Sequence, residues 1–238
     1  MKYSESLAKE ERAKIFRLFL NNQKLKFSEI EKETKIRSNM VAYHLEKMSE
    51  EGLIEKRGDY YYLTKNAEKY IPIFSNIIGE ELSPLPVVLV ALINKNKILL
   101  IKRDKRPYKG YWSLIGGKML LEESFKEASL RQVKEKTSLN GKYVSINGVM
   151  HERVKGEDII KHSFILFFTK IETKEIKFIE SKHGQLKWLN IKDVGKKEKI
   201  IPSDLWLIKN RLNYNADIKI AKMLEKEGKL SNFKILSF

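Results

Sequence analysis

Apolar residues near the start of the chain recur at helical spacing. One set lies within residues 6–20, and a second set, Val41, Leu45 and Met48, falls on one face of a segment that begins near Ser38. Charged residues separate the apolar positions in both segments, as in surface helices that pack one face onto a core. The pattern predicts two amphipathic helices.

Further signals predict a short helix between these two and a hairpin after them. Ser28 is followed three residues later by Glu31, a capping-box pattern that marks a helix start, and this helix should end near Lys35. Ser38 has a side chain suited to cap the next helix, and Gly52 is suited to end it. After Gly52, two extended runs flank a Gly-Asp turn and predict a β-hairpin.

Three helices followed by a hairpin is the element order of a winged helix. Residues 8–68 resemble the winged helix-turn-helix of bacterial and archaeal repressors, mainly in the Tyr-His-Leu run at 43–45 and the Glu-Gly-Leu-Ile turn at 51–54. In that family the third helix enters the major groove of DNA and the wing contacts the backbone. The resemblance therefore implies DNA contacts from Arg37, Ser38, Asn39, Met40, Tyr43, His44, Lys47, Lys56 and Arg57.

Other roles for this domain stay open. The implied DNA-contacting residues are mostly polar or aromatic and are expected opposite the apolar face of the third helix. Tyr43 and His44 could instead pack against the wing, and Arg37 could be a solvated turn residue. Winged helices also bind proteins, and residues 1–80 carry 15 Lys and Arg against 13 Asp and Glu, a balance of only +2.

A new pattern begins near residue 83, after a predicted helix over 65–78 that links the two halves. Two β-branched, apolar runs surround Asn-Lys-Asn at 94–96 and predict a hairpin, and a Gly-rich turn and a helix from about Glu123 to Lys136 follow. Beyond residue 212 we expect a helix over 218–228 and then a strand over 233–238.

The segment from Gly117 to Leu139 resembles the signature box of the Nudix family, Gx5Ex7REUxEExGU, in which U is a bulky aliphatic residue. The positions that match are Gly117, Glu123, Arg131, Val133, Glu135 and Leu139. The preceding glycine and the later WLNIKDV segment strengthen the resemblance, which spans about residues 85–212. It implies a Nudix-like α/β/α sandwich with a mixed sheet.

The chain is therefore expected to be an α+β protein of two domains. The predicted parts are a winged helix-turn-helix domain at 1–64, a linker helix at 65–82, a Nudix-like domain at 83–212 and a C-terminal extension at 213–238.

The box departs from the family pattern at the positions that bind metal. Nudix hydrolases hold divalent cations, usually Mg²⁺, against a diphosphate and activate water for attack on phosphorus. The family places three carboxylates on one helix face, at positions that correspond here to Gln132, Glu135 and Lys136. In addition, Ser138 replaces the box glycine and Ile115 replaces the proline before the paired glycines. The sequence predicts impaired metal binding, with Mg²⁺ needed only if the domain hydrolyses.

These departures favour a binding domain over an enzyme. An ammonium beside a pyrophosphate can replace a metal as counter-charge. Residual catalytic residues are Glu123, Arg131 and Glu135, of which Glu123 and Arg131 form a structural ion pair in the family and Glu135 is the candidate metal ligand. Ligand contacts are predicted for Arg103, Arg106, Gly116, Gly117, Lys118 and Lys136.

Residues outside the box are weaker candidates. Glu152, Glu157 and Glu180 could supply replacement carboxylates for a metal, and His151 and His162 could orient a ligand or transfer a proton, although isolated histidines are more often surface or core residues. The core or the pocket walls are the expected place of Trp112, Trp188 and Trp206.

Composition bears on partners and compartment. The chain has no cysteine, which excludes disulfides, thiolate metal sites and cysteine nucleophiles. It also has no apolar stretch of membrane-spanning length and no signal-peptide core near its start, so we expect a cytoplasmic protein without membrane partners. The net charge is +16, of which residues 81–238 carry +14, and this indicates polyanionic partners or a lysine-rich bias on solvated surfaces.

The leading hypothesis is a DNA-binding transcription regulator, acting as a homodimer, whose Nudix-like domain senses a nucleotide or nucleoside diphosphate such as ADP-ribose. One alternative is an active Mg²⁺-dependent Nudix hydrolase with an appended winged helix. A second alternative makes both domains interaction modules, with the basic second half binding RNA or DNA backbone. In the better-known Nudix regulators the Nudix part comes first, so their ligands and targets do not transfer directly to this chain.

Overall fold

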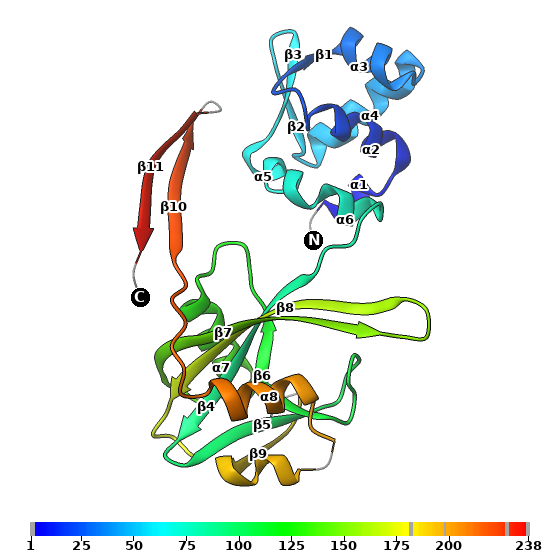
Figure 1. Cartoon of the computed structure of the whole chain (residues 1–238). Helices are drawn as coiled ribbons and strands as arrows, with labels where there is room; N and C mark the ends of the chain where they lie inside the picture. The colour runs from blue at the N-terminus through cyan, green and yellow to red at the C-terminus, as the bar shows by residue number, and fades with distance from the viewer. Residues whose placement is uncertain (1–2, 181–182, 198, 227–228, 237–238) are drawn as a thin grey trace. The chain divides into compact units, whose positions relative to one another are not determined.

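Helices and a small sheet build the first of two units, Met1–Ser83. The computed structural model describes residues 3–180, 183–197, 199–226 and 229–236 (Figure 1). The elements of the winged helix are α1 (Ser4–Leu7), α2 (Glu10–Leu18), β1 (Leu25–Lys26), α3 (Phe27–Thr34), α4 (Ser38–Glu50), β2 (Ile54–Arg57) and β3 (Tyr60–Leu63). The strands pair in the order β1-β3-β2, so the predicted winged helix with its hairpin is confirmed. The one helix predicted over residues 6–20 is divided into α1 and α2.

Two helix starts differ from the sequence prediction. α3 begins at Phe27, and the Glu29 carboxylate accepts a hydrogen bond of 2.6 Å from the backbone N–H of Lys26, so the predicted Ser28–Glu31 capping box is wrong. The earlier start lets Phe27 pack against the core of this unit. Ser38 does not cap α4, because its hydroxyl donates to the carboxylate of Glu31 on α3.

The predicted single helix over 65–78 is also wrong. The chain forms α5 (Lys65–Glu68), a 3₁₀ turn η1 (Ile71–Ile73) and α6 (Phe74–Ile78). Pro72 lies in η1 and lacks the N–H that a continuous helix would need. Ala67 and Phe74 are buried in the winged-helix core, so this segment packs with the first unit.

A six-stranded mixed sheet forms the centre of the second unit, Pro84–Phe238. Its strands are β4 (Leu85–Asn94), β5 (Lys97–Arg103), β6 (Trp112–Lys118), β7 (Lys142–Lys155), β8 (Ile160–Glu172) and β9 (Gly184–Asn190). They lie in the order β7-β8-β4-β6-β5-β9, and β4 runs parallel to β8. The hairpin predicted around residues 94–96 is confirmed, because Asn94 pairs with Lys97.

Helices cover both faces of this sheet. α7 (Phe125–Thr137) packs Val133 with Val90 on one face, and α8 (Pro202–Arg211), together with the 3₁₀ helix η2 (Ile191–Lys196), packs Leu207 with Leu89 on the other. Successive residues of β4 point to opposite faces, so one strand supplies both cores. The predicted α/β/α sandwich is confirmed. Among the residues that the structure describes, no helix is long and apolar enough to cross a membrane.

The three tryptophans have different surroundings. Trp112 is buried in the core, and Trp188 is partly buried with its indole N–H donating to the Ile176 carbonyl at 2.9 Å. Trp206 on α8 is 46 % exposed, which corrects its expected place in a core or a pocket wall.

The C-terminal segment is a hairpin, so the helix predicted over 218–228 is wrong. β10 (Ile220–Lys226) pairs antiparallel with β11 (Lys229–Leu236), in a separate two-stranded sheet that Figure 1 draws in orange and red. The strand predicted over 233–238 is confirmed as far as Leu236. Residues 227–228 and 237–238 of the two predictions lie outside the described part of the chain.

The residue that ends α7 permits a stability prediction. Ser138 adopts a left-handed conformation with φ of 60°, which costs a residue with a side chain more than it costs glycine. We expect Ser138→Gly to raise the free energy of unfolding by about 0.5 to 1 kcal/mol in urea denaturation, after allowing for the greater flexibility of the unfolded chain.

Ser124 at the other end of α7 provides the control for that measurement. Its hydroxyl accepts a hydrogen bond from the backbone N–H of Glu127 at 3.3 Å, so Ser124→Ala should lower stability by about 1 kcal/mol. A loss of stability in Ser138→Gly would contradict the expectation.

Candidate ligand pocket and DNA-facing helix

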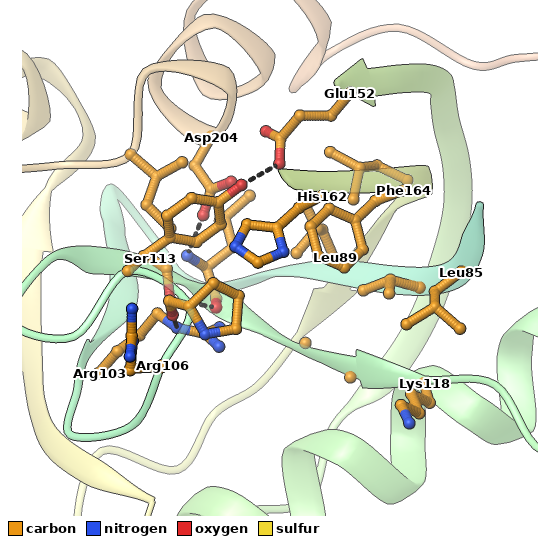
Figure 2. Close-up of a pocket in the computed structure, with 18 of the residues that line it drawn as sticks. Leu85, Leu89, Arg103, Arg106, Ser113, Lys118, Glu152, His162, Phe164 and Asp204 are labelled. Carbon is orange, nitrogen blue, oxygen red and sulfur yellow. Dashed lines mark hydrogen bonds between the residues drawn. The ribbon is translucent and has the colours of Figure 1, made fainter. Parts of the chain in front are cut away.

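A pocket of about 410 Å³ opens in the second unit, next to the central strands of the sheet. Residues of β4, β6, β7 and β8 line it, together with the end of β5, the loop after β5, Lys136 of α7 and the start of α8 (Figure 2). This volume lies within the range of small-molecule sites. The structure brings together here all six residues for which ligand contacts are predicted: Arg103, Arg106, Gly116, Gly117, Lys118 and Lys136.

The Lys136 side chain is the most distinctive group of the pocket. It reaches from α7 across to β6, where its ammonium donates a hydrogen bond to the Gly116 carbonyl. Burial and, to a smaller extent, the nearby Arg103 charge lower the pKa of Lys136 to about 8. The ammonium is therefore charged at neutral pH but close to its titration range.

Gln132 lies one turn before Lys136 and is packed against the glycine strand. Its side chain is 5 % exposed and occupies the space where a Cβ at Gly117 would be, so a larger residue at position 117 would have to displace the Gln132 amide. Its Oε1 atom has no hydrogen-bond partner among the residues described. An unpaired buried amide oxygen can accept a hydrogen bond from a ligand or from water.

The predicted ion pair of the box is present. The Arg131 guanidinium pairs with Glu123, lies 3.2 Å from the Glu135 carboxylate and donates to the Lys118 carbonyl at 3.0 Å. The hydrogen bond from Arg131 is the main cause that lowers the pKa of Glu123. The pair therefore fastens the loop before α7 to the helix.

The box residues do not fit the magnesium ion that the Nudix resemblance implies. Mg²⁺ requires oxygen ligands in a nearly octahedral arrangement. At these positions the helix offers one buried amide, that of Gln132, and one carboxylate, that of Glu135. The Glu135 carboxylate is 51 % exposed and is paired with Arg131. The third position holds the ammonium of Lys136, which repels a cation. Across the described ranges, no group of three or more His, Asp or Glu residues is arranged to hold a metal.

Acidic groups line the side of the pocket opposite the arginines (Figure 2). The Tyr108 hydroxyl donates to Glu152 Oε1 at 2.7 Å, and the Ser203 hydroxyl donates to the other oxygen of Glu152. Asp204 is 2 % exposed and accepts a hydrogen bond of 2.7 Å from the backbone N–H of Leu114, while burial raises its pKa to about 7.

Most of this acidic side was not predicted from the sequence. Glu152 was expected only as a candidate metal ligand, and no sequence pattern indicated Tyr108, Ser203 or Asp204. These residues meet through contacts between segments that are 44 and 51 residues apart, and no short-range motif signals such contacts. The one local clue is that Asp204 falls in the first turn of a helix that begins with a proline.

The other candidates outside the box are placed differently. His162 lines the pocket between Tyr108 and Phe164, and Figure 2 shows its ring near the centre of the site. His151 is exposed, and its ring nitrogen lies 3.0 Å from the Ser163 hydroxyl. Glu157 and Glu180 are exposed and are not among the lining residues of this pocket, so the structure does not bring them to the box.

Most of the residues predicted to contact DNA are exposed, as such contact requires. Met40 and Tyr43 on α4 are 39 % and 47 % exposed, and Arg37, Ser38, Asn39, Lys56 and Arg57 are exposed as well, with Lys47 partly so. His44 is an error: it is only 6 % exposed, because with Val41 and Met48 it falls on the buried side of the helix. Whether the exposed residues contact DNA stays a prediction.

Comparison with known proteins assigns the family of the second unit. Residues 83–209, more than half of the chain, match the family model of the NUDIX domain. The chain belongs to the Nudix family. Residues 9–56 match the model "Bacterial regulatory protein, arsR family", which confirms the helix-turn-helix of the first unit.

Individual relatives match over parts of their length. The "ADP-ribose pyrophosphatase" of Methanocaldococcus jannaschii is 47% identical over 66 residues, or 27% of this chain and 39% of that protein. The "Uncharacterized Nudix hydrolase YvcI" of Bacillus subtilis is 28% identical over 100 residues, or 42% of this chain and 61% of that protein. This Nudix chain thus spans less than two thirds of either relative. The solved NUDIX domain of Shewanella oneidensis NrtR complexed with ADP ribose is 19% identical, with a TM-score of 0.48 over 62% of this chain and 96% of that one.

Proposed function

We propose that this protein is a DNA-binding transcription regulator whose Nudix domain binds a nucleoside diphosphate derivative with little or no hydrolysis. The observation that carries the proposal is the Lys136 ammonium, which lies in the pocket at a box position where the family has a metal-binding carboxylate. A fixed cation can compensate the charge of a diphosphate, but it does not generate hydroxide from water as a metal ion does.

The two sides of the pocket indicate the ligand class. Arg103, Arg106 and Lys136 provide positive charge for phosphate oxygens, and the carboxylates of Glu152 and Asp204 can accept hydrogen bonds from sugar hydroxyls or ring amines. Apolar side chains such as Phe164 and Leu85 complete the wall. A nucleoside diphosphate sugar contains all three kinds of group, and the name of the M. jannaschii relative makes ADP-ribose the first compound to test.

The winged helix would supply the response to the ligand. A homodimer in the cytoplasm would place two α4 helices on a two-fold DNA site, with Lys56 and Arg57 of each wing near the backbone. The ligand alters DNA affinity only if it binds differently to the DNA-bound and free arrangements of the domains. This coupling is part of the proposal.

Calorimetric titration with ADP-ribose, in EDTA and in MgCl₂, tests the proposal on the full chain. We expect binding that does not depend on magnesium, and chromatography of the same samples should show intact ADP-ribose. In parallel, ADP-ribose should change the affinity of the protein for genomic DNA fragments that contain its own promoter region. Failure to bind the compound and its relatives in either buffer would contradict the sensor.

The second candidate function is a Mg²⁺-dependent hydrolase. Two carboxylates favour it: Glu135 remains at its box position, and Glu152 lines the pocket. In that case release of AMP should depend on magnesium and disappear in Glu135→Gln. The sensor predicts little or no release of AMP by the parent protein, and no magnesium-dependent release that Glu135→Gln could remove.

A further inference from the structure

The C-terminal ribbon of β10 and β11 carries two pairs of lysines that lie opposite each other across the strands. In the antiparallel register, Lys222 lies opposite Lys234 and Lys226 lies opposite Lys229. Cross-strand partners share a face, and residues two apart on one strand share it too, so all four lysines lie on one face. The register shift between the pairs Lys222–Lys234 and Leu224–Ser231 adds one residue on β11, which keeps Lys234 and Lys229 on the same face. Leu224 and Ser231 lie on this face between the two lysine pairs.

The lysine pairs are unfavourable for the ribbon by itself. Like charges directly opposite each other on paired strands destabilise the pairing, and an isolated two-stranded ribbon is at best marginally stable in water. All four lysines are exposed, and no carboxylate forms an ion pair with any of them in the stretches that the structure describes. Lys222 contributes only a minor part to the lowered pKa of Glu127, after the hydrogen bonds from Ser124.

The distribution of charge along the chain also favours a polyanion as the partner of this face. Residues 1–80, with the winged helix, carry a net charge of +2, whereas residues 81–238 carry +14. The pocket uses only a few of these charges. At the lysine face of the ribbon, an external polyanion would relieve the repulsion between the paired lysines.

We propose that this face, Lys222, Lys226, Lys229 and Lys234, is a second DNA-binding site that contacts the phosphate backbone without reading sequence. A two-stranded ribbon is narrow enough to follow a groove of duplex DNA, and closely spaced ammonium groups displace condensed counterions from phosphates. DNA is the favoured polyanion because the same chain carries a helix-turn-helix that matches regulatory proteins. The ribbon would add electrostatic affinity for DNA to a chain whose winged helix is nearly neutral.

The test compares full-length protein with a variant in which all four lysines are glutamine. Binding to duplex DNA of arbitrary sequence is followed by fluorescence anisotropy between about 50 and 200 mM salt. Each lost phosphate contact reduces the slope of log affinity against log salt by about 0.9, so we expect the slope to fall by about 3 to 4. The paired variants Lys222→Gln/Lys234→Gln and Lys226→Gln/Lys229→Gln should each remove about half of that change.

The matched control removes the same charge elsewhere in the second unit. Lys155, Lys161, Lys174 and Lys177 are exposed and lie outside the ribbon, and a variant with glutamine at these four positions should keep most of the slope. An equal loss in the control would reduce the proposal to a general effect of net charge and overturn it. An unchanged slope in the ribbon variant would overturn it as well.

Other polyanions are separate outcomes of the same experiment. If the ribbon lysines matter for single-stranded RNA, or for vesicles containing anionic lipid, but not for duplex DNA, the DNA site is wrong. None of these results depends on ADP-ribose, so the ribbon site and the ligand-sensing function can fail independently.

Discussion

Gln132→Glu combined with Lys136→Glu is expected to convert the protein into a magnesium-dependent hydrolase of ADP-ribose. The two changes complete a set of three carboxylates with Glu135 on one face of α7, and they remove the ammonium that repels a cation. Glutamate has nearly the shape of glutamine, so it should fit against Gly117 as Gln132 does. A metal ion contributes several kcal/mol to such reactions, and we expect AMP release to rise by about 100-fold or more.

Chromatographic measurement of AMP with and without magnesium checks this result. Adding Glu135→Gln to the double variant should abolish the gain, and Lys126→Glu, an exposed change on the same helix, should give none. A double variant that folds and binds ADP-ribose but gains no magnesium-dependent turnover would mean that the box substitutions are not what limits catalysis.

Lys136→Met is expected to weaken ADP-ribose binding by about 10- to 100-fold at pH 7, the range for loss of a charged hydrogen bond in a pocket. The methionine keeps an unbranched apolar chain but has no charge. Burial lowers the pKa of Lys136 to about 8, so its ammonium is present below that pH and is lost as the pH rises through it. The affinity of the parent protein for the anionic ligand should therefore fall between about pH 7 and 9, and that of the variant should not.

Calorimetry across this pH range distinguishes the charge from a structural role. Lys126→Met, on an exposed part of the same helix, should leave both the affinity and its pH dependence unchanged. If Lys136→Met binds ADP-ribose as tightly as the parent, the ammonium is not the phosphate counter-charge and the sensor loses its main support.

The parts of the fold that were predicted correctly have a regular short-range pattern. The hairpin of β2 and β3, the hairpin around residues 94–96 and helix α7 all follow from spacing and turn residues. The box resemblance then identified the residues around Gly116, Gly117 and Lys136, since the family fixes their places on β6 and α7.

The errors arose where tertiary pairing outweighs local preference. Residues 220–226 are rich in good helix formers, yet they form strand β10 because β11 lies beside them in register. The resemblance to winged-helix repressors placed His44 toward DNA, although its spacing from Val41 and Met48 places it among buried positions. The acidic side of the pocket depends on contacts between distant segments, which spacing along the chain does not reveal.

The burial of Ala67 and Phe74 in the winged-helix core bears on how such a chain can be assembled during evolution. The connecting segment belongs to the winged-helix unit, so a recombination event that carried only the helices and the wing would deliver an incomplete core. The segment that must be transferred as a whole extends to about Ser83, at the end of the first unit. A gene fusion made at that point would carry the winged helix with its core complete.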